Sequence, residues 1–231
     1  MQISTSRFNQ TSFNRATGTA KVGPGQRSEV AYKALEPYNV TIPAGRVSGV
    51  GVGGFTLGGG YSWVTNQVGL SCDTVVEFEV ALPTGEVVTA TNTSNADLFF
   101  GLKGGGNNFG IVTAITYKVV EQPAVWGGLV VVSGDANITS LSEAISNFQD
   151  RNTDPKAAIG VTYGFEPSSG GKDFYTLTIE GPKLICGIRQ VSSSPSSITI
   201  MDLLLLPEPL IAFLPFHLFH RHLASPLLPD W

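Results

Sequence analysis

Residues 44–63, which read AGRVSGVGVGGFTLGGGYSW, constrain the fold of this chain more than any other segment because they are dense in glycine. Glycine has no Cβ, so its main chain reaches positive φ and approaches a ligand that any other side chain would hold away. Successive N–H groups that point the same way form a concavity that binds anions. We therefore expect this segment to bind a charged group, and a phosphate suits it best.

The composition predicts a folded protein that does not bind nucleic acid. The chain has 231 residues, 42% of them hydrophobic, which is enough to fill a core. Only 14% of the residues are charged, and the net charge is −4 without a basic stripe. Nucleic-acid binding needs clustered Lys and Arg, so we exclude that class. We also expect no membrane anchor, because Asp202, Glu208 and several prolines interrupt the apolar stretch near the C-terminus.

Residues 1–121 are interpreted as one domain. The run VVEFEVALPTGEVVTAT alternates apolar and polar residues around Pro83-Thr84-Gly85, which predicts a β-hairpin with one buried face. Ser94 and Asp97 have the spacing of a capping box before a short helix, ADLFFGLK. Three glycines at 104–106 end this helix, and the β-branched run IVTAITYKVV after them predicts a strand.

The pattern changes at Gln122-Pro123, so we place an incomplete second domain over residues 122–187. Its predicted order is strand, amphipathic helix, strand, strand, which is typical of an α+β domain with an antiparallel sheet. Residues 188–231 differ in composition from both domains, and we interpret them as an irregular, non-native tail. All three histidines, His217, His220 and His222, lie in this tail without Cys, Asp or Glu at ligand spacing, so we expect no metal site.

Three motifs together resemble a known family. They are the glycine-rich segment, then GLSCDTVVEFEVALPTGEVVTA, then NADLFFGLKGGGNNFGIVTAITYKV. Their order and spacing resemble the PCMH-type FAD-binding domain of the vanillyl-alcohol oxidase and p-cresol methylhydroxylase superfamily, in its berberine-bridge-enzyme-like fungal branch. The resemblance implies an α+β FAD-binding domain with a mixed sheet and flanking helices, followed by the start of an α+β substrate domain with an antiparallel sheet. Relative to that family, the chain is truncated at both ends.

The resemblance implies FAD as the cofactor and places its contacts in both glycine-rich stretches. We expect residues 51–60 and 104–112 to lie side by side and to form a slot whose amides bind the diphosphate. Thr56 would bring a hydroxyl near the cofactor, and the main chain at 110–112 would meet the adenine side. The residues carried over are Val47, Gly51, Gly53, Gly54, Thr56, Gly58, Gly59, Gly60, Gly110, Ile111 and Val112.

Three departures from the family pattern concern the flavin. Val47 stands where many relatives carry a cysteine that bonds the flavin, so a cysteinyl bond is excluded. The family's histidine loop would lie upstream of Met1. Phe55 stands where berberine-bridge-type members carry a histidine, and its ring packs but donates no hydrogen bond.

By resemblance, the chain is an FAD-dependent oxidase that moves a hydride from a substrate C–H or alcohol to the flavin N5 atom, with O₂ as the acceptor and a small molecule as the substrate. The alternative is an inactive, truncated fragment of such an oxidase. The catalytic base is unknown, because none of the tyrosines that could serve lies in a motif that the family uses. The substrate and the oligomeric state are unknown as well. The candidates for the base are Tyr61, Tyr117, Tyr163 and Tyr175.

Several features have structural alternatives. Gly49, Gly51 and Gly54 spell a dinucleotide fingerprint, which we reject because glycines 58–60 lie where the helix of that motif would form. The glycines could instead serve as tight turns of a β-rich scaffold, and residues 104–106 as a helix stop. Thr56 and Asp73 could be an ordinary turn threonine and a capping aspartate.

Four Asn-x-Ser/Thr sequons begin at Asn9, Asn39, Asn92 and Asn137, which favours a secreted glycoprotein. The N-terminus MQISTSRFNQ has no basic and apolar signal region. We therefore expect secretion of the full-length form, with a signal peptide that this chain lacks. Cys72 and Cys186 lie beside apolar residues, and we interpret them as buried thiols, with a disulfide between them as the alternative.

Overall fold

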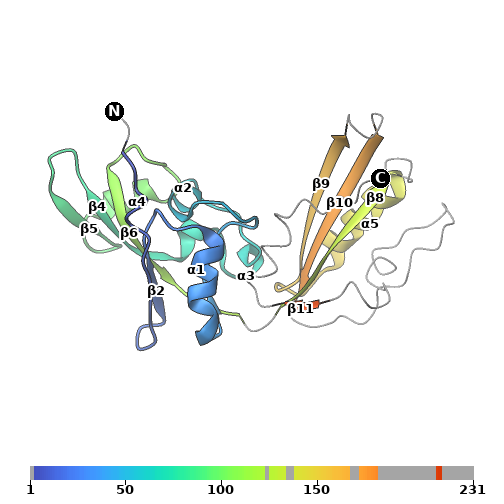
Figure 1. Ribbon diagram of the computed structural model, residues 1–231, viewed down its shortest axis with the longest axis horizontal. Helices are drawn as coiled ribbons and strands as arrows, with labels where there is room; N and C mark the ends of the chain where they lie inside the picture. The colour runs from blue at the N-terminus through green and yellow to red at the C-terminus, as the bar shows by residue number, and fades with distance from the viewer. Residues whose placement is uncertain (1–2, 123–124, 134–137, 167–171, 182–211, 215–231) are drawn as a thin grey trace. The chain divides into compact units, whose positions relative to one another are not determined.

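A computed structural model describes residues 3–122, 125–133, 138–166, 172–181 and 212–214. The chain separates into two compact units. Unit 1 contains the described residues up to Gln122, and unit 2 contains the described residues from Val125 onward. Both units combine helices with antiparallel strands, so the chain has the expected α+β fold class, and the elements of each can be followed in Figure 1.

The main sheet of unit 1 has five strands in the order β1-β2-β6-β4-β5. We expected a mixed sheet, but every pairing described in it is antiparallel, because the hairpins β1-β2 and β4-β5 reverse the chain and β6 runs antiparallel to both of its neighbours. The strands are β1 (Thr11–Asn14), β2 (Thr19–Val22), β4 (Val75–Ala81), β5 (Val87–Ala90) and β6 (Ile111–Lys118), and β3 (Val40–Thr41) pairs separately with β7 (Val120–Glu121).

The helices of unit 1 are short. They are α1 (Ser28–Leu35), α2 (Val52–Leu57), α3 (Thr65–Val68) and α4 (Ala96–Leu102), with 3₁₀ turns η1 (Glu36–Tyr38) and η2 (Ser71–Thr74). One face of the sheet is apolar, and there Phe78 of β4 packs on Phe99 of α4 with ring centroids 5.7 Å apart. Burial of this face is the main source of stability for the unit.

The hairpin predicted around Pro83-Thr84-Gly85 is confirmed by the pairing of β4 with β5. The helix after it is confirmed as α4, but its predicted capping box is wrong. Asn95 takes the N-cap position with a left-handed φ of 48° and no side-chain cap. The side-chain amide of Asn95 instead donates to the backbone carbonyl of Thr89 at 2.9 Å, so a contact with β5 replaces the local cap.

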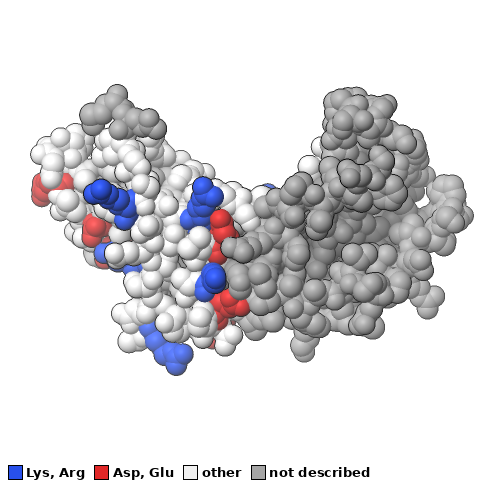
Figure 2. Space-filling view, viewed as in Figure 1, with Lys and Arg blue, Asp and Glu red and all other residues white. Residues whose placement is uncertain are grey.

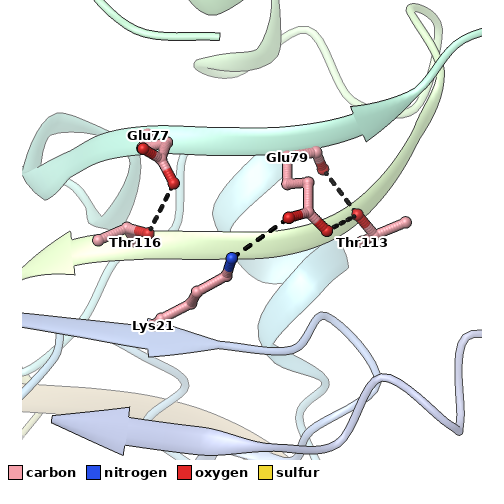
Figure 3. Close-up of polar contacts among 5 residues, drawn as sticks. All are labelled: Lys21, Glu77, Glu79, Thr113 and Thr116. Atoms are coloured by element: carbon pink, nitrogen blue, oxygen red, sulfur yellow. Dashed lines mark hydrogen bonds and ion pairs between the residues drawn. The ribbon is translucent and has the colours of Figure 1, made fainter. Parts of the chain in front are cut away.

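The surface of unit 1 carries scattered charges. Figure 2 shows Lys and Arg at separate places on the face in view, some of them beside acidic side chains. On the polar face of the sheet, Lys21 forms an ion pair with Glu79 at 3.2 Å, and the Thr113 hydroxyl donates to the same carboxylate at 2.6 Å (Figure 3). The hydrogen bond from Thr113 lowers the pKa of Glu79, with Lys21 adding to the effect.

Unit 2 has the predicted strand, helix, strand, strand order, given by β8 (Val125–Ser133), α5 (Ile138–Arg151), β9 (Ala158–Glu166) and β10 (Lys172–Gly181). The tail was expected to be irregular, yet β11 (Ala212–Leu214) pairs with β8 and completes a four-stranded antiparallel sheet. Cys186 and the three histidines lie outside the described residues. Within the described ranges, no helix has both the length and the apolarity that a membrane span requires.

Candidate functional site

The glycine-rich segment of unit 1 is hydrogen-bonded to the start of α1 and to the residues just before it. The Val52 N–H donates to the Gln26 carbonyl at 2.9 Å, and the Gly53 N–H donates to the Pro24 carbonyl at 3.2 Å. The Ser28 hydroxyl donates to the Val50 carbonyl at 3.0 Å and accepts a bond from the Gly45 N–H. These bonds hold the main chain of residues 45–53, which includes the first turn of α2, in place.

The helix α2 has one buried face and one bare face. Its buried residues are Val52, Gly53, Thr56 and Leu57, whereas Gly51, Gly54 and Gly58 are exposed. We had expected glycines 58–60 to prevent a helix here, and α2 shows that a helix forms but stops before them. The dinucleotide fingerprint remains rejected, because the sheet of this unit is antiparallel.

Some of the predicted cofactor glycines are required by packing within the protein. A Cβ on Gly53 would lie 2.8 Å from the Pro24 Cβ, and one on Gly60, at φ +79°, would lie 2.6 Å from the Phe55 ring. A Cβ on Gly110 would lie 2.8 Å from the Val80 side chain. Internal contacts therefore explain why these three positions are glycine.

Gly51 and Gly54 have no such explanation. An added Cβ would have nothing within 4 Å at either position, and neither residue has a positive φ. Glycine within a helix costs about 1 kcal/mol relative to alanine. Gly54 lies inside α2, so the fold gains nothing from its missing side chain, and an external ligand that approaches the bare face of α2 would account for it. Gly51 is the N-cap of α2, a position that favours glycine over alanine but favours Ser or Asn at least as well.

The two glycine-rich stretches meet, as the sequence predicts. The Gly106 N–H donates to the Leu57 carbonyl at 2.9 Å and joins the second stretch to the end of α2. The second stretch is less bare than expected, since a Cβ on Gly105 would lie 2.2 Å from the Gly101 carbonyl oxygen. A Cβ on Gly104, at φ +104°, would have no atom within 4 Å.

Ile111 and Val112 lie at the start of β6 and pair with β4 through Ala81 and Val80. On the other side of β6, β2 ends opposite Ile115. Among the described strand pairings, residues 111–114 thus have no strand neighbour on the β2 side. Along this edge, Ile111 and Thr113 are partly exposed, whereas Val112 and Ala114 are buried.

Thr56 uses its hydroxyl inside the core. The hydroxyl lies 2.7 Å from the Tyr117 hydroxyl and 3.0 Å from the Ser71 hydroxyl, and Ser71 donates to the Pro43 carbonyl. Since a carbonyl only accepts, Ser71 must accept from Thr56, and Thr56 must accept from Tyr117. This buried chain joins β6, α2, η2 and the segment after β3. The hydroxyl therefore faces away from the bare side of α2.

The other predicted site residues lie on the loops around α2. Val47 is exposed, Gly58 is the C-cap of α2, and Gly59, at φ +97°, would bring a Cβ to 3.6 Å from Leu70. Asp73 accepts a hydrogen bond from the Leu70 N–H at 2.8 Å, so it is the capping aspartate of η2.

The candidate tyrosines differ in environment. Tyr117 is fully buried, burial raises its pKa, and its hydroxyl donates to Thr56, so it cannot accept a proton from a substrate at the surface. Tyr61 is half-exposed and stacks its ring under the Arg46 guanidinium at 5.1 Å. Tyr163 is exposed in unit 2, and nothing further is described for the side chain of Tyr175.

Comparison with known proteins identifies the domain that contains this geometry. Residues 1–91 match the family described as FAD binding domain. An uncharacterised FAD-linked oxidoreductase of Arthroderma benhamiae is 44% identical over 78% of this chain. The chain carries an FAD-binding domain of this family. The cofactor that this domain and the matched relative indicate is FAD. Other matched fungal proteins are named FAD-dependent monooxygenases.

Solved structures agree with the FAD-binding fold. The BBE-like 1 protein of Physcomitrella patens aligns with a TM-score of 0.64 and 31% identity over 77% of this chain and 38% of its own. The carbohydrate oxidase of Microdochium nivale aligns with a TM-score of 0.61 and 32% identity over 76% of this chain and 37% of its own. The chain spans 36% of the length of the Arthroderma oxidoreductase.

Proposed function

We propose that FAD binds along the bare face of α2, with Gly51, Gly54 and Gly58 in closest approach. The observation that carries this proposal is the open space at Gly51 and Gly54, where neither backbone conformation nor packing requires glycine. The edge of β6 at Ile111 and Val112 would take the adenine side. Val47 offers no side chain for a covalent bond, so the flavin is held without a link at this position.

We further propose that the full-length protein is an oxidase of a small molecule. Bound FAD would supply a hydride acceptor at the N5 atom and would pass the two electrons to O₂, while the substrate hydroxyl loses a proton. The carbohydrate oxidase among the structural relatives supports this reaction class. In that reaction the residues of unit 1 bind and orient the cofactor, which is the part of flavoenzyme catalysis that a protein contributes.

FAD binding by this chain is the direct test. The purified 231-residue chain is incubated with FAD, desalted, and examined for flavin absorbance and for its melting temperature. We expect retained flavin, release of that flavin on acid precipitation, and stabilisation of about 2.7 kcal/mol when free FAD is one hundred times its Kd. A chain that retains no flavin absorbance, and whose melting temperature does not change when FAD is added, would support the alternative of an inactive fragment.

We also propose that the full-length protein is secreted and glycosylated. Asn9, Asn39 and Asn92 are exposed in unit 1, so a glycan at each would point into solvent, and Asn137 lies outside the described residues. After expression in a eukaryotic secretory host, we expect peptide mass spectrometry to find hexose-rich glycans on these three asparagines that a glycosidase removes. Unmodified asparagines in secreted material would contradict the glycoprotein assignment.

A further inference from the structure

Arg27 lies directly opposite the bare main chain of Gly51. The two residues form an isolated antiparallel bridge. The bonds that define it come from the flanking residues, from the Ser28 N–H to the Val50 carbonyl at 3.0 Å and from the Val52 N–H to the Gln26 carbonyl at 2.9 Å. Arg27 and Gly51 are therefore a non-hydrogen-bonded pair, the arrangement in which Cβ atoms come closest, to within about 5.5 Å.

This pairing places the stem of Arg27 beside the open space of the proposed cofactor site. Directly paired residues project from the same face of a ladder, so the Arg27 side chain leaves the main chain on the side that a Gly51 side chain would have taken. Arg27 is exposed, and nothing lies within 4 Å of a Cβ on Gly51, so the guanidinium does not fill that space. Within the described ranges, Arg27 forms no ion pair.

An anion that binds beside Gly51 would need a cationic side chain such as that of Arg27. The N–H groups of Val52 and Gly53 already donate to carbonyls of the protein. The Gly49 N–H donates to the Glu29 carboxylate at 3.0 Å, which places a negative charge at that end of the loop. An anion is thus favoured on the Gly51 and Gly54 side, away from Glu29. A planar guanidinium binds phosphate oxygens in a bidentate manner.

We propose that Arg27 binds the diphosphate of FAD across Gly51. This inference rests on the proposed function, because it takes FAD to lie on the bare face of α2. It adds a residue that lies outside all the glycine motifs. Arg46, which precedes Gly51 in the same loop, stacks its guanidinium on the rings of Tyr61 and Trp63, at 5.1 Å and 5.4 Å from their centroids. Arg27 is therefore a cation that the fold presents to the open glycines.

The test is a titration of the full chain with FAD, followed by quenching of flavin fluorescence, at low and high salt. The variants are Arg27→Gln, the conservative Arg27→Lys, and Lys33→Gln, which removes the same charge from the exposed side of α1. We expect Arg27→Gln to raise the Kd for FAD about tenfold and to flatten its salt dependence. Arg27→Lys should recover part of the affinity, and Lys33→Gln should match the parent chain.

The outcomes separate the inference from the function it rests on. If the parent chain and Arg27→Gln bind FAD equally, or if both glutamine variants lose the same affinity, the role of Arg27 is overturned and FAD binding stands. If the parent chain binds no FAD, the proposed function fails, and the role of Arg27 fails with it. Melting curves without FAD show whether each variant is folded.

Discussion

Replacing Gly54 with leucine is expected to abolish FAD binding while making the chain itself more stable. Gly54 lies in the interior of α2, its position is open, and leucine favours a helix over glycine by about 0.8 kcal/mol. The new side chain would occupy the space that the isoalloxazine or diphosphate needs. We expect a loss of affinity of about two orders of magnitude or more, which is about 2.7 kcal/mol or more. The measurements are an FAD titration and a urea unfolding curve of the chain without FAD.

Gly53→Ala is the matched control one residue away. Its Cβ would meet the Cβ and the carbonyl of Pro24 at 2.8 and 2.9 Å, so this smaller change should destabilise the chain by about 1–3 kcal/mol. The two neighbouring glycines should thus respond in opposite directions in the unfolding experiment. Unchanged FAD affinity in Gly54→Leu would show that the bare face of α2 is not the cofactor site.

Replacing Thr56 with valine is expected to cost about 2–4 kcal/mol of folding free energy, although the two side chains have nearly the same shape. The change removes the acceptor for the Tyr117 hydroxyl and the donor to Ser71, both of which are buried. The loss of an acceptor for the buried Tyr117 hydroxyl costs about 1–3 kcal/mol, and Ser71, which keeps its bond to the Pro43 carbonyl, loses one hydrogen bond worth about 1 kcal/mol. Thermal and urea unfolding of the chain without FAD measure the effect.

Thr56→Ser keeps the hydroxyl and is the control, with an expected cost of about 1 kcal/mol for the lost methyl group. The double variant Thr56→Val with Tyr117→Phe removes the stranded donor as well, so it should be more stable than the sum of the single changes predicts. If Thr56→Val unfolds at the same urea concentration as the parent chain, the hydroxyl chain contributes nothing to stability.

Alkaline pH tests the same chain of hydroxyls. Burial raises the pKa of Tyr117 above the value of about 10 that it has when unfolded. The folded state therefore holds the proton that the unfolded state loses, and stability falls as the pH rises above about 10. In Tyr117→Phe this contribution is absent, so the alkaline loss should be smaller.

The sequence predicted most elements that depend on local periodicity. The β4-β5 hairpin, α4, β6 and the strand order of unit 2 follow from alternation, turn residues and β-branched runs. The cap of α4 was wrong because Asn95 is held by a carbonyl of β5, a partner that helix spacing does not reveal. The helix α2 was missed because its first turn is held by the carbonyls of Gln26 and Pro24.

The amino-acid sequence by itself determined that bare main chain concentrates in two stretches of this protein and that their order matches an FAD-binding domain. Only the tertiary structure decided which glycines face the protein, as Gly53 and Gly60 do, and which face open space, as Gly51 and Gly54 do. It also placed Arg27 opposite Gly51. The physical reason is that the need for glycine at a position depends on the atoms that surround it in space. Those atoms belong to residues from other parts of the chain, and local sequence patterns do not reveal which residues they are.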